Sequence, residues 1–163
     1  DADPADLDQT IDTNVSAVLH ACHAVLPGMI ERGRGHLVLL GSTAGLHALP
    51  ATVYGASKGA IHMMTASLRL DLVGTGVRVT DLAPGIAETE FSVVRNSGNK
   101  SAANSVYEGT VPLSAEDIAE QIAHIANLPD HININRVEMV PVRQAWGPYA
   151  IHREQGPSHE QEA

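Results

Sequence analysis

The sequence predicts an α/β fold in which parallel strands alternate with helices. Residues 36–40 (HLVLL) are a short continuous apolar run, typical of a strand that is buried on both faces of a parallel sheet, and residues 77–82 (VRVTDL) are predicted to be the next strand. Between them, residues 54–72 carry apolar side chains at helical spacing. A strand, a helix and a second strand in this order predict a right-handed crossover, with helices packed on the faces of the sheet.

Composition places limits on the class of protein. The 163 residues are 44% hydrophobic, which is enough for one domain with a core, and the net charge is −9. Because no stripe of Lys and Arg could neutralise phosphates, we expect no nucleic-acid partner. No apolar run reaches the roughly 18 residues of a membrane span. With one cysteine, Cys22, and no helical His-x-x-x-His pair, we expect a soluble cytoplasmic protein without a metal.

The first predicted helix runs from Asp6 to about residue 30. Gln9, three positions after Asp6, would complete a capping box. We expect Pro27 and Gly28 to kink or loosen the last turns, and the glycines of residues 32–35 (RGRG) to end the helix. Its apolar side chains form one stripe of Ile11, Val15, Val18, Cys22, Val25 and Met29, and a second set of Leu19, Leu26 and Ile30.

The helix of residues 54–72 also has two apolar stripes. One face can pack on the sheet, and the other needs a partner outside the subunit, so we expect a homo-oligomer with isologous contacts. The glycines of residues 74–76 (GTG) end this helix. The first stripe consists of Ile61, Met64, Leu68 and Leu72, and the second of Met63, Ala66, Leu70 and Val73.

The rest of the chain is predicted to contain one more helix and one more strand. The polar stretch 95–107 is predicted to be a mobile loop and a candidate lid. Ser114 caps a helix that has Asp117 at its third position and runs to about residue 128. Residues 137–142 form the last strand, and the polar tail from His152 onward is expected to fray.

Ser42, Tyr54 and Lys58 outline a proton-transfer site. Tyr54 and Lys58 lie four residues apart on one face of the predicted helix, so the ammonium can approach the phenol. A phenol has an ordinary pKa of about 10, and a nearby positive charge lowers it. Ser42 follows the first strand and can hydrogen-bond a substrate oxygen. The alternative is an exposed Tyr–Lys pair without function, but with three tyrosines in the chain this spacing seldom arises by chance.

These motifs resemble the short-chain dehydrogenase/reductases over nearly the whole chain. The residues that carry the resemblance are 41–45 (GSTAG), 54–58 (YGASK), 12–15 (DTNV) and 84–86 (PGI). Within that family the sequence is most similar to the NADP-dependent 3-hydroxy acid dehydrogenases, which include serine and allo-threonine dehydrogenases. This closer similarity lies in residues 26–29, 89–92, 131–135 and 137–142.

The resemblance implies a catalytic role for four residues. Tyr54 would exchange a proton with the substrate hydroxyl or carbonyl while a nicotinamide cofactor exchanges the hydride. Lys58 would lower the pKa of Tyr54 and bind the nicotinamide ribose. Ser42 would orient the substrate oxygen, and Asn14 would hold a water in a proton relay behind Lys58.

The resemblance also implies how cofactor and substrate are held. Pro84, Gly85 and Ile86 would lie against the nicotinamide, together with Tyr54 and Lys58, and Thr89 would bind the carboxamide or phosphate region. Independently of the family, Arg95 on the predicted lid is our candidate for a substrate carboxylate, because its planar fork pairs with both oxygens. The alternative for Arg95 is an ordinary solvated surface residue.

The cofactor half of this family begins with a strand and a glycine-rich turn that receives the pyrophosphate. No G-x-x-x-G-x-G pattern follows a strand in this sequence. We therefore expect residues 1–163 to form a single domain, the second half of a doubly wound, Rossmann-like sheet whose N-terminal cofactor-binding half is absent. The strand 36–40 would then lie at an open edge. NADP is the expected cofactor, and NAD is an alternative because the selecting residue belongs to that half.

Two functions follow from these observations. In the first, the chain is the catalytic half of an NAD(P)-dependent oxidoreductase that acts on a small molecule, a 3-hydroxy acid. In the second, it is a non-catalytic module that serves as an oligomerisation partner or scaffold. The resemblance implies a homodimer or homotetramer, formed through the two long helices and the C-terminal strand.

Overall fold

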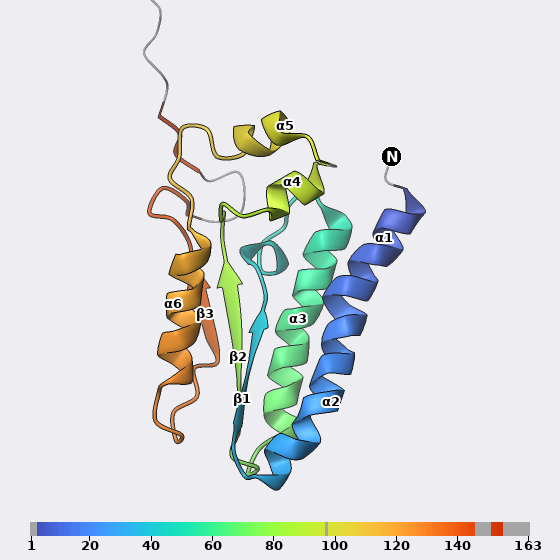
Figure 1. Cartoon of the computed structure of the whole chain (residues 1–163), viewed down its shortest axis with the longest axis vertical. Helices are drawn as coiled ribbons and strands as arrows, with labels where there is room; N and C mark the ends of the chain where they lie inside the picture. Colours follow the sequence, from blue (N-terminus) through green and yellow to red (C-terminus); the bar gives the residue numbers. More distant parts are fainter. Residues whose placement is uncertain (1–2, 97, 146–150, 155–163) are drawn as a thin grey trace, which may run out of the picture.

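The computed structural model describes residues 3–96, 98–145 and 151–154, and its centre is a parallel sheet between helices (Figure 1). The strands are β1 (Gly35–Leu40), β2 (Val77–Pro84) and β3 (Arg136–Met139), in the order β1-β2-β3, and both pairs are parallel. The predicted alternation of strands and helices is therefore confirmed. Within this sheet β1 is an edge strand, and Leu40 at its end is 51% exposed.

The N-terminal helix begins earlier than the sequence predicted. Asp3 caps α1 (Pro4–Ile11) by accepting a hydrogen bond from the N–H of Ala5. Pro4 fits the first turn because it has no N–H to leave unpaired. The predicted start at Asp6, with a capping box to Gln9, is therefore wrong.

The same helix continues beyond α1 with a change of geometry. A π-helical stretch, Asp12–Ser16, joins α1 to α2 (Ala17–Glu31). No sequence pattern predicted this stretch. Pro27 lies inside α2, which continues without a break to Glu31, and Gly33, two residues beyond this end, has a φ of +64°.

The core lies between the sheet and the helices α2 and α3 (Thr52–Asp71) (Figure 1). Ile61 and Leu72 of α3 are buried, and Met64 and Leu68 pack against the same cluster. The first predicted stripe of this helix therefore faces the sheet. The other buried members of the cluster are Cys22, Leu37, Leu39 and Val79.

The second stripe of α3 has no cover from the described part of the chain. Met63 is 68% exposed, Leu70 77% and Val73 79%. Leu19 and Ile30 of α2 are also exposed. Large apolar side chains on both helices thus face outward. The two stripes predicted for the N-terminal helix are not kept apart, because Leu26 of the second set packs against the core cluster while Ile11 and Val25 of the first stripe are exposed.

The segment predicted as a mobile loop, 95–107, contains helical structure. It includes the end of α4 (Phe91–Arg95) and all of α5 (Lys100–Ser105). The Asn99 side chain caps α5 by accepting from the N–H of Ala102. Asn is common in both loops and helix caps, so composition alone gave the wrong interpretation.

The last helix, α6 (Ala115–Ala126), has the predicted capping box between Ser114 and Asp117. At its other end the guanidinium of Arg78 donates to four carbonyl oxygens. Arg78 and Val79 are successive residues of β2, so their side chains point to opposite faces of the sheet. Since Arg78 bonds to the end of α6 and Val79 packs with residues of α3, these two helices cover opposite faces. The four carbonyls belong to Ile125, Ala126, Leu128 and Ile132.

The C-terminal strand is shorter than predicted. β3 ends at Met139, although the prediction extended to residue 142. Pro141 cannot donate to a strand ladder, which favours an early end. The predicted fraying of the tail falls mostly on residues 155–163, outside the described residues.

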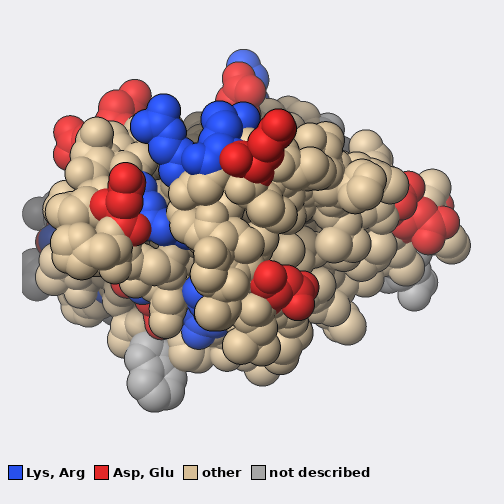
Figure 2. Space-filling model, turned by 90° about the horizontal axis from the view of Figure 1, so that it is seen from below, with Lys and Arg blue, Asp and Glu red and all other residues tan. Residues whose placement is uncertain are grey.

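Two surface properties complete the description. None of the described helices has the length and apolarity needed to cross a bilayer. Figure 2 shows the molecule from below, where basic and acidic side chains lie interspersed among uncharged surface. This end is opposite the carboxyl ends of the strands, which point upward in Figure 1.

Candidate active site

A cavity of about 380 Å³ lies at the carboxyl ends of β1 and β2. In open α/β sheets this edge is where ligands bind. The cavity brings together every site residue that the sequence singled out, from three helices, a turn, the end of β2 and the loop that follows it. These are Asn14, Ser42, Tyr54, Lys58, Pro84, Gly85, Ile86, Thr89 and Arg95.

Ser42 is held by the turn that follows β1. Its backbone is extended, and its hydroxyl accepts a hydrogen bond of 3.1 Å from the N–H of Ala44. Its carbonyl accepts from the N–H of Gly45 at 3.0 Å. A Cβ on Gly45 would lie 2.4 Å from the carbonyl carbon of Lys58, so this glycine allows the turn to approach α3 closely.

Tyr54 lies in the first turn of α3 with its ring against Phe91. The two ring centroids are 5.3 Å apart and tilted by 41°. Burial raises the pKa of Tyr54, while the hydrogen bond with Ser42 and the charge of Arg95 lower it. Because burial is the largest of these effects, the pKa of Tyr54 lies above the ordinary value for tyrosine, and the phenol keeps its proton to a higher pH.

Lys58 bonds to the sheet. Its Nζ donates to the carbonyl of Leu40 at 2.8 Å and lies 5.9 Å from the centroid of the Tyr54 ring. Burial lowers the pKa of Lys58, and the charge of Asp81 raises it. We expected Lys58 to lower the pKa of Tyr54, but the pKa of Tyr54 is raised, since burial of the phenol outweighs the hydrogen bond with Ser42 and the charge of Arg95.

Asn14 lies in the π-helical stretch. Its Nδ2 donates to the hydroxyl of Ser57 at 3.0 Å, and Ser57 in turn donates to the carbonyl of Tyr54 at 2.8 Å. A π-helical turn redirects side chains, and such turns are common at functional sites. The stretch thus points an otherwise ordinary helical asparagine at α3.

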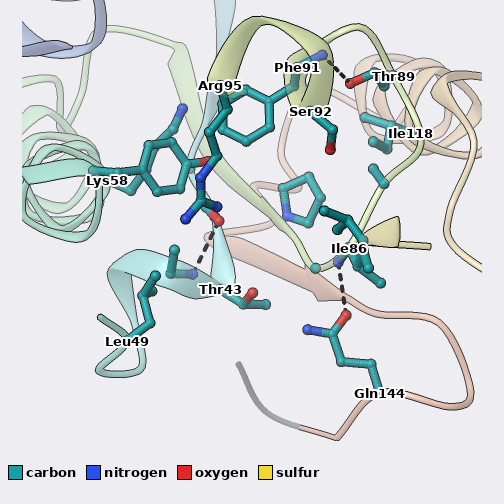
Figure 3. Close-up of a pocket in the computed structure, with 18 of the residues that line it drawn as sticks. Thr43, Leu49, Lys58, Ile86, Thr89, Phe91, Ser92, Arg95, Ile118 and Gln144 are labelled. Atoms are coloured by element: carbon teal, nitrogen blue, oxygen red, sulfur yellow. Dashed lines mark hydrogen bonds between the residues drawn. The ribbon is translucent and has the colours of Figure 1, made fainter. Parts of the chain in front are cut away.

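Pro84, Gly85 and Ile86 form the wall of the cavity that follows β2. The side-chain oxygen of Gln144 accepts from the N–H of Ile86 at 2.8 Å (Figure 3). A Cβ on Gly85 would lie 2.3 Å from that oxygen, so the close approach requires glycine. Thr89 is exposed, and its hydroxyl accepts from the N–H of Phe91 at 3.2 Å.

Arg95 extends from α4 across the cavity towards the turn that carries Thr43 (Figure 3). Its charge is one of the two influences that lower the pKa of Tyr54. Arg153 also lines the cavity, but its guanidinium donates to the carbonyls of Val106 and Glu108. Arg95 is therefore the better placed of the two for an anionic group.

Sequence reasoning missed Phe91, Gln144 and His62. Phe91 is one of few aromatic residues, and Gln144 follows the last strand, but neither has a motif of its own. His62 offered a signal, because it stands four residues after Lys58 on the same helical face. Over the described ranges no cluster of three or more His, Cys, Asp or Glu side chains could hold a metal.

Comparison with known proteins gives one family. The model of the family described as short chain dehydrogenase matches residues 1–100. The chain is 51% identical over 156 residues to sulfoacetaldehyde reductase 2 of Chromohalobacter salexigens, a match covering 94% of this chain and 62% of that protein. It is 44% identical over 151 residues to the NADP-dependent 3-hydroxy acid dehydrogenase YdfG of Escherichia coli K12, covering 91% and 61%.

A solved structure is similar over the same part. The closed form of serine dehydrogenase complexed with NADP⁺ superposes with a TM-score of 0.88 at 43% identity. The match covers 94% of this chain and 62% of that one. The chain therefore spans about three-fifths of the length of the relatives it matches.

We predict that Ser42→Ala raises the pKa of Tyr54 further, because it removes a hydrogen bond that favours the phenolate. Phenolate absorbance measured against pH, with Tyr54→Phe subtracted as the reference, reports this change. Since the folded state holds the Tyr54 proton more tightly than the unfolded state, stability should also decrease as pH rises above about 10. An unchanged titration in Ser42→Ala would contradict the assigned hydrogen bond.

Proposed function

The chain belongs to the short-chain dehydrogenase family, and we propose that residues 1–163 are the catalytic and C-terminal part of an NADP-dependent oxidoreductase. The enzyme would interconvert a hydroxyl and a carbonyl on a small anionic substrate. The observation that carries this proposal is the single cavity that contains Tyr54, Ser42, Lys58 and Arg95. Relatives named as NADP-dependent or complexed with NADP⁺ support the choice of cofactor.

The residues present fit one end of NADP. Pro84, Gly85, Ile86 and Thr89 line the same cavity as Tyr54 and Lys58, and the close packing at Gly85 keeps the loop after β2 against Gln144. These residues would hold the nicotinamide and its ribose. When bound, the cofactor supplies or accepts the hydride.

Tyr54 is the proposed acid and base. In reduction, the phenol donates its proton to the carbonyl oxygen of the substrate, and in oxidation the phenolate takes the proton back from the hydroxyl. Burial raises the pKa of Tyr54, so the protonated form, the proton donor, predominates at neutral pH. Ser42 would hydrogen-bond the same substrate oxygen and orient it.

Lys58 and Asn14 are proposed to act behind Tyr54. Lys58 would bind the ribose hydroxyls, at the point where its amine now donates to the carbonyl of Leu40. Asn14 would hold the water that links Lys58 to solvent. Its bond to Ser57, which donates to the carbonyl of Tyr54, supports a position next to the catalytic helix.

Arg95 is proposed to bind the anionic group of the substrate. The relatives are named for substrates that carry a carboxylate or a sulfonate, and a guanidinium pairs with either. A 3-hydroxy acid is the first candidate and sulfoacetaldehyde the second. The nearness of the Arg95 charge to Tyr54 supports a substrate short enough to reach both residues.

We also propose that the exposed apolar stripe of α3 is an interface between copies of this chain. Three large side chains there, Met63, Leu70 and Val73, are each more than two-thirds exposed. Exposed apolar surface of this kind is typical of protein contacts. A two-fold contact would place the stripe against itself and give a homodimer or a homotetramer.

We predict that Tyr54→Phe, in the protein that joins this chain to its cofactor-binding half, lowers kcat by at least about 10²-fold. The variant loses the proton donor but keeps the ring packing on Phe91. NADPH binding, measured by its fluorescence, should be retained. Turnover within tenfold of the parent would rule out Tyr54 as the acid.

We predict that Arg95→Ala raises KM for 3-hydroxy acids and sulfoacetaldehyde by about tenfold or more, because an ion pair to a charged group is lost. Uncharged alcohols of similar size should be almost unaffected. Arg34→Ala, at the other end of the molecule, is the matched control. An equal loss for charged and uncharged substrates would mean that α4 has only been distorted.

We predict that Leu70→Glu yields folded monomers, since it places a charge in the proposed interface and not in the core. Met64→Glu is the matched control, and it should unfold the protein because Met64 packs against the core cluster. Light scattering with circular dichroism separates these outcomes. A parent protein that is monomeric at tens of micromolar would contradict the interface.

A further inference from the structure

His62 is a buried histidine for which the proposed reaction has no role. Its side chain is 7% exposed and lies on α3, four residues after Lys58 and eight after Tyr54. At helical spacing the three side chains share one face. On one side, Nδ1 of the ring contacts Oδ2 of Asp81, and on the other, Nε2 lies 3.0 Å from the carbonyl oxygen of Ser42. The ring thus connects the centre of the sheet to the serine turn.

Asp81 is held by a second partner. It lies on β2 with 1% exposure, and its Oδ2 also accepts from Nε of Arg136 on β3 at 2.9 Å. A Cβ on Gly41 would lie 2.4 Å from Oδ1 of Asp81 and 2.8 Å from the His62 ring. The absence of a side chain at Gly41 therefore lets carboxylate and imidazole pack directly beneath the end of β1.

The partners of His62 determine where its protons lie. A carbonyl oxygen can only accept a hydrogen bond, so Nε2 must carry the proton that it shares with Ser42. Nδ1 faces a carboxylate, which donates only if it is itself protonated. Either the ring is doubly protonated or Asp81 carries the second proton, and in both cases Nε2 is a donor.

We propose that His62 is a positioning residue, which donates its Nε2–H to the Ser42 carbonyl and so holds the Ser42 hydroxyl at the phenol of Tyr54. Asp81, fixed by Arg136, orients the ring. The catalytic importance of this contact rests on the function proposed above for Ser42 and Tyr54. The contact itself can be tested without turnover.

The local bonds of the turn do not replace His62. The Ser42 carbonyl also accepts from the N–H of Gly45, and the hydroxyl accepts from the N–H of Ala44. Both bonds lie within the turn, so they fix its shape but not its place relative to α3. His62 supplies a hydrogen bond between the backbone of the turn and the helix that carries Tyr54.

The test uses the titration of Tyr54 in the full-length protein without cofactor. We expect His62→Leu to raise the pKa of Tyr54, in the same direction as Ser42→Ala, because the Ser42 hydroxyl is no longer held at the phenol. The double variant Ser42→Ala/His62→Leu should show no further shift beyond Ser42→Ala alone, since both changes remove the same interaction. His62→Gln, whose amide can donate to the carbonyl, should restore part of the parent value.

The matched control is His36→Leu. His36 is a partly buried histidine on β1 that bonds to the hydroxyl of Thr80 and does not touch the serine turn. It should lower the melting temperature without moving the Tyr54 titration. An unchanged titration in folded His62→Leu, or full additivity in the double variant, would overturn the proposal.

A second measurement does not depend on whether His62→Leu folds. Nitrogen NMR of the parent protein, with the ring of His62 assigned through its backbone, reports which ring nitrogens carry protons. We expect Nε2 to carry a proton in the folded protein at neutral pH. An Nε2 without a proton could not donate to Ser42, and this result would reject the proposal outright.

Discussion

The site depends on the attachment of one face of α3 to the end of β1. Lys58 bonds to the Leu40 carbonyl and His62 to the Ser42 carbonyl, and the Ser42 side chain lowers the pKa of the Tyr54 phenol. Tyr54, Lys58 and His62 come from successive turns of a rigid helix, so their spacing is set before any ligand binds. Glycines at positions 41 and 45 let helix and strand end approach closely enough for these bonds to form.

The other walls of the cavity are fixed by residues distant in sequence. Gln144, after the last strand, holds the loop after β2 through the N–H of Ile86. Phe91 of α4 packs on the Tyr54 ring, and Arg153 joins the C-terminal segment to the backbone that follows α5. The proposed acid Tyr54 and its neighbour Lys58 thus lie on α3, while the proposed substrate side of the cavity is made of short helices and a C-terminal segment. This division suits a family whose members act on different substrates.

Much of this arrangement could be predicted from sequence, because it depends on local patterns. A continuous apolar run identified β1, and the four-residue spacing placed Tyr54 and Lys58 on one helical face. The capping box at Ser114 identified the start of α6. The contacts of His62, Gln144 and Phe91 join residues from separate elements, and no local pattern encodes them. The pKa of Tyr54 was predicted in the wrong direction because sequence gives charge but not burial.

The π-helical stretch at Asp12–Ser16 has a geometric consequence for the whole N-terminal helix. Each residue of an α-helix advances by about 100°, and a π turn adds one residue, so the faces of α1 and α2 are out of phase. The apolar residues predicted as one stripe from Ile11 to Met29 therefore do not lie on one face of the helix. Ile11 is exposed, whereas Cys22 is buried. Removing one residue there would bring the two segments into phase and rotate Asn14 away from Ser57. The position of Asn14 at the cavity therefore depends on the number of residues in this stretch as well as on their identity.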